Sequence, residues 1–320
     1  EDPLGFAAVR YSVPRFLIDT WAGAYGIEPA VEQARRSILT PGVALRVHVG
    51  RTNRDSLRAD LAAVDVETAD LQPAAGQHPR PDDPRIAREM LRWVGGRAPF
   101  GVEPFVRGQC SVQDPTAFGA ALAIDPRPGD HIFDFCSAPG GKATALAERL
   151  GTNGRVFAFD IDPDRRKLVR EAARRLGLTD RLVVLDELEQ LPPVDHSLVD
   201  VPCSNTGVMA RRVEVRHRLY PGLFAELAQL QLELLVKAIR RTRPGGRIVY
   251  STCSIDPTEN QKVVEEAVRT QTVTLASQHL TLPNPPHHDG GYFAVLVRDA
   301  LPPSEPPPPA PPSTGSHAQK

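Results

Sequence analysis

Residues 105–299 alternate between short apolar runs and stretches in which apolar residues have helical spacing. Short apolar runs bounded by turn residues indicate buried strands, and apolar residues three and four positions apart indicate amphipathic helices. The pattern predicts strands over 131–135, 155–161, 181–185, 198–201, 247–252 and 292–298, and helices over 142–150, 164–176, 221–243 and 257–268. Because strands alternate with helices, we predict an α/β fold with a doubly wound, mostly parallel sheet.

Residues 1–104 follow a different pattern, which predicts a smaller N-terminal α+β domain. Trp21 and the apolar residues at 16–18 have helical spacing, whereas Leu45 and Val47 alternate with polar residues, as in a half-buried strand. A strand followed by a helix with basic residues suits a small RNA-binding module, and equally any other small α+β domain. Prolines over 72–86 predict a linker, and the proline-rich residues 300–320 predict a disordered tail after a second domain at 105–299.

The composition excludes several classes of protein. Lys and Arg number 38 against 39 Asp and Glu, which argues against nucleic-acid binding by bulk charge but leaves room for a local basic surface. The four cysteines include no C-x-x-C pair, so we expect neither a zinc site nor another metal, and four in 320 residues do not form a disulfide framework. We therefore expect reduced thiols in a cytoplasmic, monomeric protein.

The two ends of the sequence add two expectations. No apolar run approaches the roughly 18 residues of a membrane span, so we expect no membrane partner. The chain begins with Glu1 and not with Met, which suggests a fragment that lacks an N-terminal part.

A glycine-containing turn follows the first predicted strand of the parallel sheet. It consists of Cys136, Ser137, Ala138, Pro139, Gly140, Gly141 and Lys142. The two glycines allow the backbone to approach a ligand closely, and a helix that begins there offers free N–H groups to an anion. Asp160 ends the next predicted strand, 19 residues after Gly141. A carboxylate there can accept hydrogen bonds from both ribose hydroxyls of a nucleoside cofactor.

Other interpretations of this turn remain open. The full G-x-G-x-x-G spacing is absent, which weakens a dinucleotide site, and a glycine turn can simply pack a helix on a strand. Asp186 follows the third predicted strand, where an acidic group would meet an adenine amino group. Glu187 and Glu189 lie close to Asp186 in the chain and make that assignment weaker.

Two cysteines follow the next two predicted strands. Asp200-Val201-Pro202-Cys203-Ser204 ends one strand, and Thr252-Cys253-Ser254 ends the following one. The carboxyl ends of parallel strands meet at one edge of a sheet, so both thiols should face the cofactor turn. A cysteine at a strand end is more often a small buried apolar residue, and spacing alone keeps that alternative open.

Together these motifs resemble the Nop/Sun family of RNA cytosine-5 methyltransferases. The resemblance covers about residues 10–299, and its supporting segments are Val112-Gln113-Asp114, Pro257-Thr258-Glu259-Asn260 and Asp289-Gly290-Gly291-Tyr292-Phe293-Ala294. It implies a Rossmann-like class I methyltransferase fold, S-adenosylmethionine as cofactor and RNA as substrate, with ribosomal RNA expected.

The resemblance also implies a role for each site residue. Cys253 is the nucleophile, and Cys203 assists release of the methylated product. Residues 136–142, with Asp160, Asp186 and Asp200, line the cofactor and base sites. A thiolate that adds to carbon 6 of cytosine activates carbon 5, and Asp200 is placed to stabilise the charge that develops at nitrogen 3 and the amino group. Spacing alone does not identify which cysteine attacks.

Arginines suggest where RNA could bind. Arg211, Arg212, Arg216 and Arg218 follow the first cysteine and could hold phosphates, whereas the basic residues over 165–175 suit a solvated helix face. Two alternatives remain: a methyltransferase that acts on DNA or protein, and a non-catalytic RNA-binding ribosome assembly factor with a relic site. The paired cysteines argue against the first, and the complete set of motif residues argues against the second.

Overall fold

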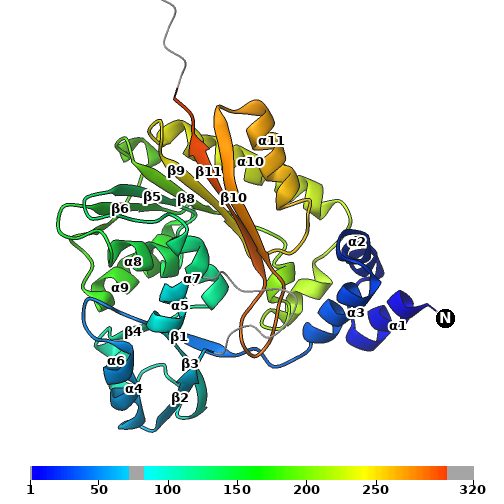
Figure 1. Ribbon diagram of the computed structural model, residues 1–320, viewed down its shortest axis with the longest axis horizontal. Helices are drawn as coiled ribbons and strands as arrows, with labels where there is room; N and C mark the ends of the chain where they lie inside the picture. The colour runs from blue at the N-terminus through cyan, green and yellow to red at the C-terminus, as the bar shows by residue number, and fades with distance from the viewer. Residues whose placement is uncertain (1, 72–82, 301–320) are drawn as a thin grey trace, which may run out of the picture.

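The computed structural model describes residues 2–71 and 83–300. Most of the predicted linker and nearly all of the predicted tail lie outside these described residues. The described chain contains two sheets with the helices that pack on them, and three further helices at the N-terminus (Figure 1).

The larger sheet has seven strands in the order β10-β11-β9-β8-β5-β6-β7. Its strands are β5 (His131–Phe135), β6 (Arg155–Phe159), β7 (Leu182–Val184), β8 (His196–Asp200), β9 (Arg247–Thr252), β10 (Val273–Thr281) and β11 (Gly291–Arg298). β11 runs antiparallel to both of its neighbours, and the pairs from β9 to β7 are all parallel. The predicted doubly wound, mostly parallel sheet is therefore confirmed.

Helices cover both faces of this sheet (Figure 1). One face carries α7 (Pro115–Leu122), α8 (Gly141–Ala147) and α9 (Pro163–Leu176), and the other carries α10 (Leu223–Arg241) and α11 (Gln261–Thr270). Successive strand residues point to opposite faces. In β5, accordingly, Ile132 packs with the first helix layer and Phe133 with the second. Burial on both faces explains why these strands are continuous apolar runs in the sequence.

The smaller sheet is antiparallel, with the order β2-β3-β1-β4. Its strands are β1 (Val43–Val47), β2 (Val66–Asp70), β3 (Met90–Gly96) and β4 (Cys110–Val112), and its helices are α4 (Arg54–Ala62), α5 (Pro84–Glu89) and α6 (Glu103–Val106). The sheet takes β4 from beyond residue 104. The division into domains at 104–105 stays a prediction.

Three helices precede the smaller sheet: α1 (Pro3–Tyr11), α2 (Arg15–Tyr25) and α3 (Ile27–Arg36). Leu17 and Trp21 of α2 are buried in one cluster with Met209 and Ile255, which follow the two predicted cysteine motifs. The chain after β8 also contains the short 3-10 helices Thr206–Val208 and Val213–His217, and Leu188–Gln190 forms another before β8. The N-terminal helices thus pack against the segments that follow Cys203 and Cys253.

Two general properties apply to residues 2–71 and 83–300. None of their helices is long and apolar enough to cross a membrane. No three His, Cys, Asp or Glu side chains within these ranges are grouped so that they could hold a metal ion.

Candidate active site

The glycine-containing loop connects β5 to α8 at the point where the strand order of the large sheet reverses. Cys136 and Gly140 have φ values of +63° and +102°, so the backbone turns through left-handed conformations. A Cβ on Gly140 would lie 3.3 Å from Val169 of α9, so both φ and the available space favour glycine. The Ser137 N–H donates to the carbonyl of Phe159 at 3.0 Å and ties the loop to the end of β6.

Asp160 directly follows β6 and lies against this loop. Its carboxylate accepts hydrogen bonds from the N–H groups of Ala138 at 3.3 Å and Asp162 at 3.1 Å. Asp186, by contrast, is exposed, and its carboxylate lies 2.7 Å from the guanidinium of Arg170. The structure therefore brings Asp160 to the loop, whereas the ligand contacts of Asp160 and Asp186 stay predictions.

A cavity of about 200 Å³ lies beside the loop. Buried polar atoms without a partner among the described residues occur on three of its side chains: both carboxylate oxygens of Asp134, the hydroxyl of Ser137 and Nε2 of Gln113. Buried polar groups are normally hydrogen-bonded, so these atoms indicate a site for a polar ligand. Burial and the nearby Asp200 raise the pKa of the Asp134 carboxyl well above its usual value.

The two predicted thiols lie next to each other. Cys203 follows β8 and Cys253 follows β9, and these strands are parallel neighbours. The two Sγ atoms are 3.2 Å apart, and both cysteines are free thiols. The Cys253 thiol also donates to Oδ1 of Asn205 at 3.2 Å, and Nδ2 of Asn205 donates to the Cys203 carbonyl at 2.7 Å.

An ion pair connects the cofactor loop with the cysteine side. Nζ of Lys142 lies 2.6 Å from Oδ2 of Asp200, across the boundary between β5 and β8. Burial opposes the charge on Lys142, but Asp200 and Cys253 outweigh it and raise the pKa of the Lys142 ammonium. Lys142 therefore stays a cation and interacts electrostatically with Cys253.

Cys203 has different surroundings. Its contact with the Cys253 sulfur, burial and the nearby Glu259 carboxylate raise the pKa of the Cys203 thiol well above its usual value. A cation thus acts on Cys253 and a carboxylate acts on Cys203. Because a nearby negative charge disfavours the thiolate, these surroundings favour the neutral thiol of Cys203.

Glu259 is fully buried and contacts both of the loops that carry the cysteines. Its carboxylate accepts hydrogen bonds from the backbone N–H of Ser204 at 2.8 Å, from the Ser254 hydroxyl at 2.6 Å and from Nε2 of Gln231 at 2.9 Å. The Ser204 hydroxyl also donates to it. Since Ser204 and Ser254 each follow one of the cysteines, Glu259 fixes the two loops relative to each other.

Comparison with known proteins gives the chain its family. Residues 121–297 match the model of the 16S rRNA methyltransferase RsmB/F family. The chain belongs to the RsmB/F family. This membership confirms the predicted resemblance to Nop/Sun proteins, and the family consists of methyltransferases.

Two curated relatives illustrate the similarity. The chain is 33% identical over 279 residues to the probable ribosomal RNA small subunit methyltransferase B of Bacillus subtilis, covering 84% of this chain and 58% of that protein. It is 30% identical over 314 residues to a protein of the same name from Synechocystis, covering 91% and 68%. The chain thus spans only part of the length of the RsmB/F relatives it matches.

Solved structures with lower identity share the fold. A methyltransferase homolog from Pyrococcus horikoshii has a TM-score of 0.78 at 22% identity, covering 93% of this chain and 99% of that one. NSun6 from the same organism, solved with SFG, has a TM-score of 0.75 at 18% identity, covering 90% and 99%. These similarities confirm the class I methyltransferase fold of this RsmB/F chain.

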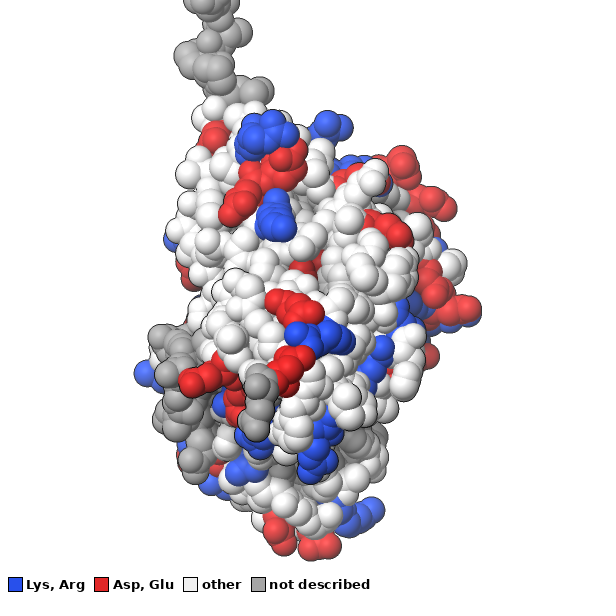
Figure 2. All heavy atoms as spheres, turned by 90° about the vertical axis from the view of Figure 1, so that its right-hand side faces the viewer, with Lys and Arg blue, Asp and Glu red and all other residues white. Residues whose placement is uncertain are grey.

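The arginines after the first cysteine of this RsmB/F chain are mostly engaged within the protein. Arg211 lies 2.9 Å from the Asp289 carboxylate, Arg212 donates to Asn205 at 2.8 Å, and Arg216 donates to the Ser37 hydroxyl at 3.0 Å. On the face in Figure 2, basic side chains are interspersed with acidic ones and do not gather in one broad patch. Phosphate binding by these arginines stays a prediction.

The sequence alone gives no role to several residues at the site. Glu259 belongs to a supporting motif, but a short polar segment does not reveal that this side chain is buried. The same holds for Asn205, which has a left-handed φ of +64° and contacts both cysteines. Asp134 can be singled out from the sequence, because it is a charged residue inside an apolar strand. The structure shows that its side chain is fully buried.

Proposed function

We propose that this chain is an S-adenosylmethionine-dependent RNA (cytosine-5)-methyltransferase that acts on small-subunit ribosomal RNA through a covalent cysteine–cytosine adduct. The observation that carries the proposal is the 3.2 Å approach of the Cys203 and Cys253 sulfurs beside the Lys142–Asp200 ion pair. Two thiols suit a reaction that forms and then breaks one sulfur–carbon bond. The names of the curated relatives support ribosomal RNA as the substrate.

The residues beside the loop fit S-adenosylmethionine. Asp160 offers carboxylate oxygens for a ribose, and the unpartnered atoms of Asp134 and Ser137 offer partners for a polar group. Gly141 lines the cavity, where the absence of a side chain leaves room for a ligand. When bound, this cofactor supplies an electrophilic methyl group for carbon 5.

The first task of the protein is to make carbon 5 of cytosine nucleophilic. The Cys253 thiolate forms a bond to carbon 6, and the π electrons of the C5–C6 bond move toward nitrogen 3. Asp200 faces the nitrogen 3 and amino edge and stabilises the charge that develops there. Lys142 holds Asp200 in place through their 2.6 Å ion pair.

The second task is to release the methylated base. The hydrogen on carbon 5 leaves as a proton, the C5–C6 double bond reforms, and the electron pair of the sulfur–carbon bond returns to Cys253. Cys203 lies beside that sulfur and assists this step. The base must be unstacked before either thiol reaches it, so an RNA loop or a flipped nucleotide is the expected substrate.

A methylation assay tests the proposal. The chain is incubated with S-adenosylmethionine and small-subunit ribosomal RNA, and in parallel with DNA and with protein. Mass spectrometry of the digested RNA should detect 5-methylcytidine. Methylation of DNA or protein in place of RNA, or of another atom, would contradict the proposal, and RNA binding without turnover would favour the relic assembly factor.

A further inference from the structure

Cys203 and Cys253 are reduced thiols whose sulfur atoms are already in contact. Their Sγ atoms are 3.2 Å apart, and each side chain is partly exposed. Two bonded sulfurs lie about 2.0 Å apart, so a movement of roughly 1 Å would bring this pair to bonding distance. The two cysteines can therefore form a disulfide by adjusting their side chains.

Hydrogen bonds to the main chain hold the two cysteines in this position. The Cys203 carbonyl accepts a hydrogen bond from Nδ2 of Asn205 at 2.7 Å, and the Cys253 carbonyl accepts one from the N–H of Gly207 at 2.9 Å. The buried Glu259 carboxylate adds a connection between the two loops. These bonds involve no sulfur atom, so they persist when the sulfurs react and keep each thiol at a high effective concentration beside the other.

Oxidation of such a pair by hydrogen peroxide takes two balanced steps. In the first, one sulfur bonds to an oxygen of the peroxide, the oxygen–oxygen bond breaks, and the thiol proton leaves with the other oxygen as water. In the second, the neighbouring sulfur attacks the resulting sulfenic acid, the sulfur–oxygen bond breaks, and hydroxide leaves with the proton of the attacking thiol as a second water. The thiols are oxidised to a disulfide, and the peroxide is reduced.

The surroundings of Cys203 suit the second of these steps. The contact with the Cys253 sulfur, burial and the Glu259 carboxylate raise the pKa of the Cys203 thiol well above its usual value. A thiol that stays protonated reacts slowly with peroxide, so we expect the oxidant to attack Cys253 first. Cys203 is then the thiol that converts the sulfenic acid to a disulfide. Without such a neighbour, further peroxide carries a sulfenic acid to the irreversible sulfinic acid.

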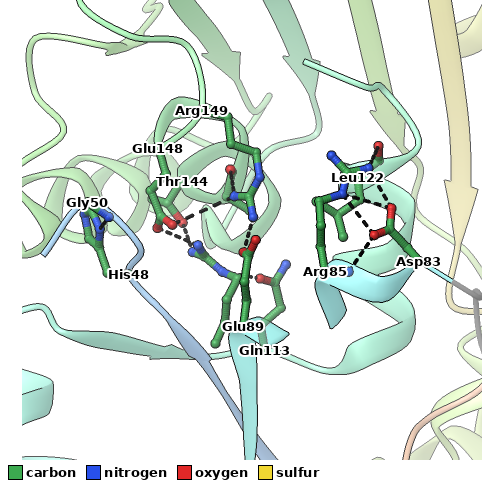
Figure 3. A network of polar contacts seen from close by, with 12 residues as sticks. His48, Gly50, Asp83, Arg85, Glu89, Gln113, Leu122, Thr144, Glu148 and Arg149 are labelled. Carbon is green, nitrogen blue, oxygen red and sulfur yellow. Dashed lines mark hydrogen bonds and ion pairs between the residues drawn. The ribbon is translucent and has the colours of Figure 1, made fainter. Parts of the chain in front are cut away.

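The other two cysteines of the chain lie in different surroundings. Cys110 is fully buried on β4 of the small sheet. Figure 3 shows Gln113, which directly follows β4, in the polar network beside α8. Cys136 lies on the glycine-containing loop. Burial raises the pKa of the Cys110 thiol to about 11 and that of the Cys136 thiol to about 12, which makes both of them poor targets for peroxide.

We propose that Cys203 and Cys253 form an oxidative modification site, in which a hydroperoxide converts the two thiols into a reversible disulfide and Cys203 protects Cys253 from irreversible oxidation. The disulfide occupies both sulfurs, so methyl transfer should stop until a dithiol reductant restores the thiols by thiol–disulfide exchange. Formation of the disulfide rests on the geometry of the two loops, and only the loss of methyl transfer rests on the proposed function.

Mass spectrometry of the chain after treatment with hydrogen peroxide tests this inference. The chain is oxidised without RNA or cofactor, unfolded, alkylated with iodoacetamide and digested. In most of the protein a disulfide should join the peptides that contain Cys203 and Cys253, whereas Cys110 and Cys136 should be alkylated. Dithiothreitol should separate the joined peptides and restore methyl transfer.

The outcomes of this experiment separate the inference from the proposed function. Absence of the disulfide, a disulfide between Cys253 and Cys136, or direct conversion of Cys253 to the sulfinic acid would overturn the inference. A chain that forms the reversible disulfide but never transfers a methyl group would support the inference and contradict the proposed function.

Variants test whether Cys203 protects its neighbour. In Cys203→Ser, Cys253 has no thiol beside it, so the same dose of peroxide should raise the yield of sulfinic acid at Cys253 by about tenfold or more. Dithiothreitol should not reverse this product. Cys136→Ser is the matched control and should form the disulfide in the same yield as the unmodified chain. An equal yield of sulfinic acid in Cys203→Ser and the unmodified chain would show that Cys203 gives no protection and would overturn the inference.

Discussion

The site has a cysteine side, around Cys203 and Cys253, and a cofactor side, around the cavity beside the glycine-containing loop. The two sides differ in whether their buried polar groups have hydrogen-bond partners within the described protein. Around Cys203 and Cys253, the carboxylate of Glu259 accepts hydrogen bonds from both loops. Around the cavity, Asp134 and Gln113 keep buried atoms without partners among the described residues. The difference shows that internal hydrogen bonds position the cysteine loops, whereas the unpaired atoms at the cavity are available to bind a ligand.

This contrast has a physical reason. Two thiols that must reach one atom need fixed positions before the substrate arrives, so their loops are held by an internal acceptor. A binding site gains affinity only from groups that the free protein leaves available. Substitutions at Cys253, Glu259 and Asp160 therefore each test one side.

The largest effect is expected on the cysteine side. Cys253→Ala should reduce methyl transfer by several orders of magnitude, because it removes the group proposed to add to carbon 6. Affinity for S-adenosylhomocysteine should not change, since Cys253 does not line the cavity. A filter assay and calorimetry measure the two quantities. Substantial transfer by this variant would contradict the assignment of the nucleophile.

Glu259 should be the next most sensitive position. Glu259→Ala leaves Ser204, Ser254 and Gln231 without their acceptor and should lower the free energy of unfolding by about 3 kcal/mol. Glu259→Gln keeps one oxygen acceptor and should lose less stability and retain partial turnover. Urea unfolding and turnover at saturating cofactor measure both. A stability within about 1 kcal/mol of the unmodified chain for Glu259→Ala would show that the network does not hold the loops.

Asp160 tests the cofactor side alone. Asp160→Ala should weaken the binding of S-adenosylmethionine by roughly 1–3 kcal/mol. The variant loses hydrogen bonds to a neutral ribose, and the Ala138 N–H loses its acceptor. Asp164→Ala is a suitable control, since the Asp164 side chain is exposed and forms an ion pair with Lys167. Calorimetric titration that returns an unchanged affinity for Asp160→Ala would count against the cofactor assignment.

A smaller effect concerns pH and lies between the two sides. Burial and the nearby Asp114 raise the pKa of Asp289 to about 7 from a usual 3.8. Between these values Asp289 binds more protons in the folded chain than in the unfolded chain, so its contribution to stability should fall as pH rises from about 4 to about 7. Asp289→Asn should remove part of this slope, at most ~1.4 kcal/mol per pH unit.

Urea unfolding across this pH range measures the slope. Asp299→Asn is the control, since Asp299 forms an exposed contact with Thr274. An identical slope for Asp289→Asn and the unmodified chain would show that Asp289 does not titrate in this range.

The sequence predicted the large sheet well because its strands are buried on both faces and read as continuous apolar runs. It missed β10, whose Ser277, Gln278 and His279 interrupt the apolar pattern at the edge of the sheet beside a bulge. The sequence also predicted the loop, Asp160 and both cysteines, since these follow strand ends. It could not predict the Arg46–Gln113 contact, which joins residues 67 positions apart through the packing of two sheets.

A denaturing gel of the chain after incubation with RNA and S-adenosylmethionine tests the central claim, the division of labour between the two thiols. Cys203→Ala should still attack and methylate the base but should fail to break the adduct, so protein and RNA should migrate together as a slow band. Cys253→Ala, and the double variant, should give no such band. Normal turnover by Cys203→Ala, or a covalent band from Cys253→Ala, would contradict the roles assigned to the two cysteines.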